Sequence, residues 1–221
     1  MTATVEERLR RLAAHDTPTV SDALERTGRF GTITGLGRLT TSARVAGLAV
    51  TMQLGPAGPE KPAAHLGARA VDASDDRSVI VVAGGSRVCG GWGGLLSRAA
   101  QLAGVRGVLL DGLLRDVDEA VELGFPVFAR GVTPLTARGR QVEVASGTPV
   151  EIEGVVVRPG DLVLADGSGA VVVPAEAADE VLDAADEIAE RETRMVGRLR
   201  AGESAAAVMD RSYETMVEVR P

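Results

Sequence analysis

An arginine and an aspartate at positions 115 and 116 are the pair of residues best suited to chemistry in this sequence. They follow the apolar run Gly107–Asp111, which is typical of a strand buried on both faces. Open α/β sheets bind ligands at the carboxyl ends of such strands. A guanidinium can bind a carboxylate through two parallel hydrogen bonds, and an aspartate is a suitable ligand for a hard divalent cation. Arg115 and Asp116 therefore indicate a site for an acidic substrate and a metal ion, unless the acids here only stabilise the start of a helix.

A glycine-rich turn precedes this pair in the chain. The expected strand Ser78–Ala83 is followed by a turn that is rich in glycine up to position 94, and then by an expected helix over 95–102. This order suggests a dinucleotide site, but Leu96 stands where the last glycine of the G-x-G-x-x-G pattern belongs. The free amides at the start of the helix can still bind an anion, such as a substrate carboxylate.

Composition argues against several other kinds of protein. The chain has 221 residues, with 24 Lys and Arg against 31 Asp and Glu, so it lacks the dense positive face that nucleic acids and anionic membranes need. Its single cysteine, Cys89, and its two histidines, His15 and His65, argue against a metal site built from those residue types. We expect His65 to be structural and His15 to lie at the surface.

No apolar run approaches the length of about 18 residues that spans a membrane. Because the charged start lacks the apolar stretch of a signal peptide, a cytoplasmic protein is expected.

The pattern of apolar residues predicts an α/β fold in one domain to position these side chains. Strands and helices alternate over 78–129, which is typical of a parallel α/β unit. Short strands with glycine turns over 150–173 predict an antiparallel β region packed on that unit. We expect an N-terminal helical segment over 1–43, an α/β core over 44–174, and a C-terminal helix and tail over 175–221.

The bounds of the individual elements follow from apolar periodicity and from the positions of Gly and Pro. The expected helices cover 5–14, 17–27, 65–71, 95–102, 115–123 and 175–200, and the expected strands cover 44–53, 78–83, 107–111, 126–129, 150–152, 155–157, 162–165 and 170–173. Thr17 is expected to cap the second helix. Asp161 and Asp166 stand in turns, where aspartate is favoured for its local hydrogen bonds, and are expected to be structural.

Two runs of the sequence resemble the signature of a known family. The runs Gly107–Glu119 and Leu123–Gly131 are similar to those of the RraA-like family, which holds the 4-hydroxy-4-methyl-2-oxoglutarate/4-carboxy-4-hydroxy-2-oxoadipate aldolases and the regulator of ribonuclease activity A. Further similar segments are Trp92–Leu96, Arg158–Asp166 and Val171–Pro174. Together they extend over about residues 45–202 in the family's order and spacing.

The resemblance implies a fold, an assembly and a set of site residues. The fold would be a swivelling β/β/α domain with N-terminal helices and a long C-terminal helix, and the protein would form a homotrimer or a hexamer with its active site between subunits. Asp116 would ligate Mg²⁺ or Mn²⁺, and Arg115 would bind a small 2-oxo acid. The amides of the first helical turn, at Leu95 and Leu96 after Gly93 and Gly94, would receive the substrate carboxylate.

A glutamate of the neighbouring subunit is also expected to reach the ion through water. Glu192 is the best match for it, and Glu190 is the alternative.

The sequence departs from the family pattern at two positions. Family aldolases carry an acid 21 residues before the arginine, where this chain has Gly94, and many members carry another acid where it has Ala83. The first of these acids orients water bound to the metal, and loss of such a group weakens affinity or activity by roughly 10–100-fold. Putting an acid back at position 94 is therefore expected to raise lyase activity.

The function predicted first is a metal-dependent (class II) lyase, which cleaves a C–C bond of a 2-oxo acid by retro-aldol cleavage or by decarboxylation of oxaloacetate. Two alternatives remain open, because Gly94 and Ala83 favour them. One is a non-catalytic regulatory or binding protein, and the other is a diverged family enzyme that acts on a related acid.

Overall fold

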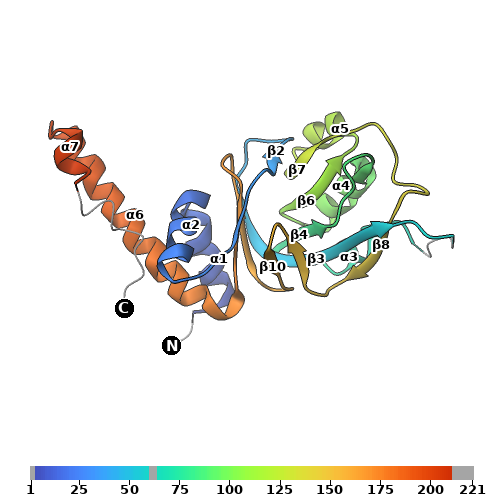
Figure 1. Cartoon of the computed structure of the whole chain (residues 1–221), viewed down its shortest axis with the longest axis horizontal. Coiled ribbons are helices and arrows are strands. Elements are labelled where there is room, and N and C mark those ends of the chain that lie inside the picture. The colour runs from blue at the N-terminus through green and yellow to red at the C-terminus, as the bar shows by residue number, and fades with distance from the viewer. Residues whose placement is uncertain (1–2, 60–63, 211–221) are drawn as a thin grey trace.

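The computed structural model describes residues 3–59 and 64–210. It shows an α/β body with a long helix that projects from one end (Figure 1). Among the described residues, no helix combines the length and the apolar character needed to cross a membrane.

Two helices open the chain, α1 (Val5–Ala14) and α2 (Thr17–Arg26). Asp16, rather than Thr17, caps α2, because its carboxylate accepts a hydrogen bond of 3.0 Å from the amide of Thr19. Thr17 instead donates its hydroxyl to Asp166. His15 was expected at the surface, but it is buried and its Nε2 lies 2.7 Å from a carboxylate oxygen of Asp186 on the long helix.

Ten strands of the described chain form one sheet, in the order β1-β12-β11-β3-β4-β6-β7-β2, with β5 paired to β6 and β8 paired to β3. These strands are β1 (Thr32–Ile33), β2 (Gly37–Arg38), β3 (Val45–Pro56), β4 (Ser78–Ala83), β5 (Gly90–Trp92), β6 (Gly107–Leu114), β7 (Val127–Val132), β8 (Gln141–Ser146), β11 (Leu162–Ala165) and β12 (Ala170–Val173). The remaining two, β9 (Val150–Ile152) and β10 (Val155–Val157), form a separate antiparallel hairpin.

The four strands β3, β4, β6 and β7 pair in parallel, which confirms the predicted parallel unit. Strands β11 and β12 were expected in a region packed on that unit. They instead extend the same sheet, because β11 pairs antiparallel with β3 and places Leu162 opposite Leu48. The edge of β3 thereby gains hydrogen-bond partners for its backbone.

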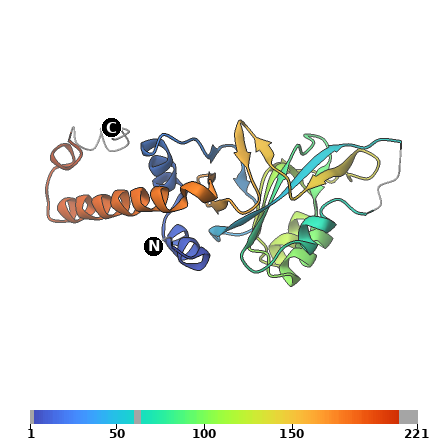
Figure 2. The same ribbon diagram turned by 90° about the horizontal axis from the view of Figure 1, so that it is seen from below.

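The two faces of the sheet are covered differently. Helices α3 (Ala68–Asp72), α4 (Gly94–Leu102) and α5 (Val117–Glu122) lie together on one face (Figure 2). Side chains of β6 alternate between the faces: Val108 and Leu110 belong to the core under the helices, whereas Leu109 belongs to the core shared with β9 and β10. Because both faces are covered, β6 is apolar at successive positions.

The C-terminal region begins with a short 3-10 helix, η1 (Ala175–Ala177), and continues as α6 (Ala178–Arg200), followed by α7 (Ala205–Val208). The first half of α6 packs on α2, and its last buried residue is Ile188. The second half projects away from the body (Figures 1 and 2). This arrangement agrees with the predicted N-terminal helices and long C-terminal helix.

Candidate functional site

The Arg115–Asp116 pair lies at the carboxyl end of β6. The strand was expected to end at Asp111, but it continues to Leu114 because β5 and β7 both pair with its last residues. The amide of Arg115 donates a hydrogen bond of 2.9 Å to the carbonyl of Trp92, which extends this pairing. Asp111 itself forms an ion pair with Arg130 at 3.0 Å and does not line the cavity that opens beside Asp116.

Asp116 has an unusual backbone conformation that turns its side chain toward α4. Its φ of 58° and ψ of 45° place it in the left-handed region, which few residues other than glycine adopt. It stands before the first residue of α5 but makes no capping hydrogen bond to that helix. Instead, its Oδ2 accepts a hydrogen bond of 3.1 Å from the amide of Gly94, and its Oδ1 lies 3.6 Å from the guanidinium of Arg115. The carboxylate is therefore not simply a cap for α5.

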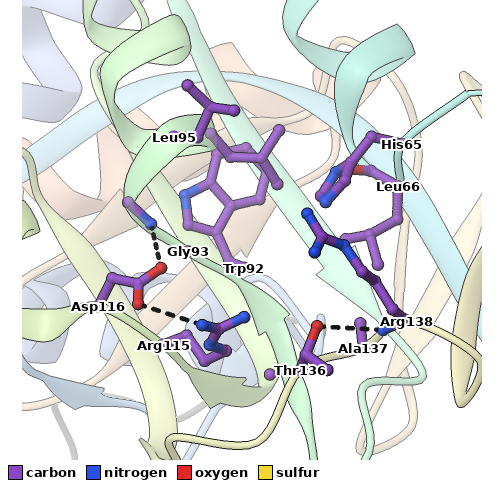
Figure 3. Close-up of a pocket in the computed structure, with 13 residues that line it drawn as sticks. His65, Leu66, Trp92, Gly93, Leu95, Arg115, Asp116, Thr136, Ala137 and Arg138 are labelled. Carbon is purple, nitrogen blue, oxygen red and sulfur yellow. Dashed lines mark hydrogen bonds and ion pairs between the residues drawn. The ribbon is translucent and has the colours of Figure 1, made fainter.

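A cavity of about 260 Å³ opens beside this carboxylate. Arg115 and Asp116 lie on one side, and His65 and Arg138 lie across from them (Figure 3). The other lining residues are Leu66, Gly90, Trp92, Gly93, Gly94, Leu95, Leu96, Thr136 and Ala137. The cavity thus brings together the six residues that the sequence predicted for substrate binding and catalysis: Gly93, Gly94, Leu95, Leu96, Arg115 and Asp116. Their roles in binding and catalysis stay predictions.

The buried side chain of Trp92 holds the start of α4 in place. It is only 2% exposed, and its Nε1 donates a hydrogen bond of 3.0 Å to Oγ of Ser97. Ser97 in turn donates to the carbonyl of Gly93 at 3.1 Å. The amides that begin α4, at Leu95 and Leu96, have no acceptor within the helix and remain available for an anionic ligand.

Arg115 carries a buried nitrogen that fits a ligand-binding role. Its Nε is buried and has no hydrogen-bond partner among the described residues. A buried donor without a partner costs about 1–3 kcal/mol. Gly90 makes room for the side chain, because a Cβ at that position would lie 2.7 Å from Cγ of Arg115. A small movement of the side chain would let this unpaired N–H donate to a ligand oxygen in the cavity.

Sequence reasoning missed two polar residues on the far side of the cavity. His65 was expected to be structural, and its Nδ1 does lie 2.7 Å from the carbonyl of Leu66, but its ring also lines the cavity. Arg138 carried no motif, because it belongs to a loop between β7 and β8. Only the folding of this loop alongside β5, where the amide of Gly90 donates to the carbonyl of Leu135, brings Arg138 to the site.

The predicted contribution of Glu192 is not made within one chain. Glu192 lies on α6, which packs on α2 far from α4 and α5 (Figure 1). Partial burial, followed by the nearby carboxylates of Asp16 and Asp22, raises the pKa of its carboxyl group. A contact with the site of a neighbouring subunit stays a prediction.

Comparison with known proteins places the chain in a family. The family model described as RraA-like (Aldolase/RraA) matches residues 17–172, and the chain belongs to this family. The crystal structure of an uncharacterized protein from Pseudomonas syringae pv. tomato is similar, with a TM-score of 0.85 and 31% identity over 94% of each chain. That of Streptomyces coelicolor RraAS2, described as an unusual member of the RNase ES inhibitor RraA protein family, gives a TM-score of 0.78 at 30% identity, over 90% of this chain and 98% of that chain. The expected RraA-like fold is therefore confirmed.

Several curated relatives of this chain are named as aldolases. A protein of Halalkalibacterium halodurans named "Putative 4-hydroxy-4-methyl-2-oxoglutarate aldolase" is 34% identical over 87 residues, which cover 39% of this chain and 40% of the relative. The matched regions cover between 32% and 58% of the length of the first curated relatives.

Proposed function

We propose that this protein is a divalent-metal-dependent lyase that breaks a C–C bond of a small 2-oxo acid. The reaction would be retro-aldol cleavage of a 4-hydroxy-2-oxo acid, such as 4-hydroxy-4-methyl-2-oxoglutarate, or decarboxylation of oxaloacetate. The observation that carries this proposal is the meeting of Asp116, Arg115 and the first turn of α4 at one cavity. The aldolase names among the relatives support it.

The residues present fit a hard divalent cation such as Mg²⁺ or Mn²⁺. Within the described residues, no three His, Cys, Asp or Glu side chains form a group that could hold a metal. However, Mg²⁺ is commonly bound by only one or two carboxylates, with water and substrate as the other ligands. Gly93 leaves the carboxylate of Asp116 uncovered on one side, since a Cβ at position 93 would lie 3.0 Å from its Oδ2. Asp116 would therefore hold the ion.

The reaction needs negative charge to be stabilised on the oxygen of the 2-oxo group as the C–C bond breaks. A bound divalent ion would supply positive charge there. Arg115 would donate hydrogen bonds to the substrate and share the developing charge. The amides of Leu95 and Leu96 would bind the substrate carboxylate and set its orientation. The buried ring of Trp92 forms the apolar base under these groups.

The test is pyruvate release from 4-hydroxy-4-methyl-2-oxoglutarate and from oxaloacetate, with Mg²⁺ or Mn²⁺ added to the protein. We expect turnover with at least one substrate, loss of turnover in EDTA, and recovery when excess Mn²⁺ is returned. Turnover that persists in EDTA, or no pyruvate from either substrate, would contradict the proposal.

A second candidate function is regulation of a ribonuclease without catalysis. Gly94 favours it, because the family aldolases carry an acid there, and so does the description of the Streptomyces coelicolor relative. This function predicts a stoichiometric complex with an RNase E-type ribonuclease in size-exclusion chromatography, together with no metal-dependent pyruvate release.

A further inference from the structure

The side chain of Glu119 occupies the space above Gly94. Glu119 lies on α5 and Gly94 is the first residue of α4. A Cβ built on Gly94 would overlap Oε2 of Glu119 and would lie 2.6 Å from its Cδ. The same Cβ would lie 3.1 Å from Cβ of Asp116. The room that a side chain at position 94 would need is therefore already filled by a carboxylate from the neighbouring helix.

Contacts with α4 hold this carboxylate in place. Arg98, one turn after Gly94 on α4, lies with a guanidinium nitrogen 3.1 Å from Oε1 of Glu119. The other oxygen, Oε2, faces Gly94. Glu119 also follows Asp116 by three positions, and both side chains are directed toward the start of α4. Two carboxylates thus converge on one glycine, with Arg98 beside one of them and Arg115 beside the other.

We propose that Glu119 supplies the second carboxylate of the cation site, in the place where family aldolases carry an acid at position 94. This inference rests on the proposed function, because it concerns the same ion as Asp116. A divalent cation held by Asp116 would attract the second oxygen of Glu119, Oε2, which faces Gly94. Oxygen ligands from one or two carboxylates are the usual protein contribution to such a site. Because Glu119 stands behind Gly94 and is not among the residues that line the cavity, it acts on the ion through a water molecule of the hydration shell.

A purely structural role for Glu119 makes a different prediction. If the ion pair with Arg98 only joins α4 to α5, loss of the charge will lower the melting temperature slightly and leave cation affinity unchanged. Cation affinity of the full chain therefore separates the two roles, and it does not depend on any enzymatic assay.

The experiment is calorimetric titration of the full-length protein with Mn²⁺. We expect Glu119→Gln to weaken Mn²⁺ binding by roughly 10–100-fold. Asp118→Asn is the matched control, because it removes the same charge from an exposed position in the same turn of α5 and should leave the affinity at the wild-type value. Circular dichroism confirms that each variant is folded.

Moving the acid from position 119 to position 94 provides an independent test. We expect Gly94→Asp alone to weaken Mn²⁺ binding and to lower the melting temperature, because the new side chain meets the carboxylate of Glu119. The double variant Gly94→Asp with Glu119→Ala should regain Mn²⁺ binding. This revises the expectation, drawn from the sequence alone, that an acid at position 94 is sufficient to raise activity.

Mn²⁺ binding by variants of Asp116 and Glu119 distinguishes a failure of this inference from a failure of the proposed function. If Asp116→Asn weakens Mn²⁺ binding and Glu119→Gln does not, the inference about Glu119 is wrong and the proposed function stands. If neither Asp116→Asn nor Glu119→Gln changes Mn²⁺ binding, the cation does not bind here and both are wrong.

Discussion

Asp116 combines a strained backbone with the carboxylate that the proposed reaction needs. Its φ of 58° costs a residue with a Cβ about 1 kcal/mol, whereas glycine adopts this conformation freely. We therefore expect Asp116→Gly to be more stable than Asp116→Ala by about 1 kcal/mol in urea unfolding. Both variants lack the carboxylate and should lose metal-dependent turnover. Equal stability of the two would show that the strain is absent in solution.

Arg115 is expected to act on the substrate rather than on the cation. Lysine keeps the positive charge but loses the planar pair of donors. Arg115→Lys should raise KM about 10-fold, the equivalent of about 1.4 kcal/mol, while calorimetric Mn²⁺ affinity stays unchanged. A loss of Mn²⁺ affinity in this variant would instead mean that Arg115 organises the cation site.

The sequence alone predicted a ligand site at Arg115 and Asp116, because they follow a buried strand, and the structure places both residues at one cavity. It could not show that Glu119 faces Gly94. That contact depends on how α5 lies against α4, and the left-handed conformation of Asp116 sets the direction in which α5 leaves the strand. Local sequence patterns contain no information about either.

At the scale of helices and strands, Asp166 joins the N-terminal helix α2 to the sheet through hydrogen bonds, and their contribution to stability can be measured. This buried carboxylate lies in the turn between β11 and β12 and accepts hydrogen bonds from the amide and hydroxyl of Thr17, at 2.9 and 2.7 Å. Burial acts to raise its pKa, but the hydrogen bonds from Thr17 and Ser168 outweigh burial, so the pKa is lowered. The ionised carboxylate therefore stabilises the folded state.

We expect Asp166→Asn to cost about 1–3 kcal/mol of unfolding free energy at neutral pH. Because the pKa is lower in the folded than in the unfolded state, this contribution is present above the ordinary aspartate value of about 3.9 and is lost as the pH falls below it. Urea unfolding of both proteins from pH 7 to pH 3 should show the difference shrinking toward acid. A difference that does not change with pH would exclude this electrostatic origin.

Strand bounds were predictable where apolar residues run without interruption, as in Ser78–Ala83. They were wrong where pairing with a distant segment decides the conformation. Gly90–Trp92 was expected to be a turn, yet it is a strand because it pairs with the end of β6. Pairing of Leu110 and Leu113 with β7, on either side of Asp111, keeps Asp111 within β6 against the preference of aspartate for turns.

The overall shape favours an assembly of several chains. The second half of α6 projects from the body with no buried residue after Ile188, although Val196 and other apolar residues lie along it. A projecting helix with apolar side chains gains stability when another chain covers it. We expect light scattering at micromolar concentration to give three or six times the chain mass of 22.8 kDa. A monomer would contradict both this assembly and the predicted contribution of Glu192 to a neighbouring site.

The cation and substrate sites can be located together in a crystal structure of the protein grown with Mg²⁺ and oxalate, which resembles a pyruvate enolate. We expect an ion at about 2.1 Å from a carboxylate oxygen of Asp116. Oxalate should bind that ion, contact the guanidinium of Arg115 and accept hydrogen bonds from the amides of Leu95 and Leu96. A cavity that binds neither Mg²⁺ nor oxalate at saturating concentrations, or an ion held away from Asp116, would contradict the account.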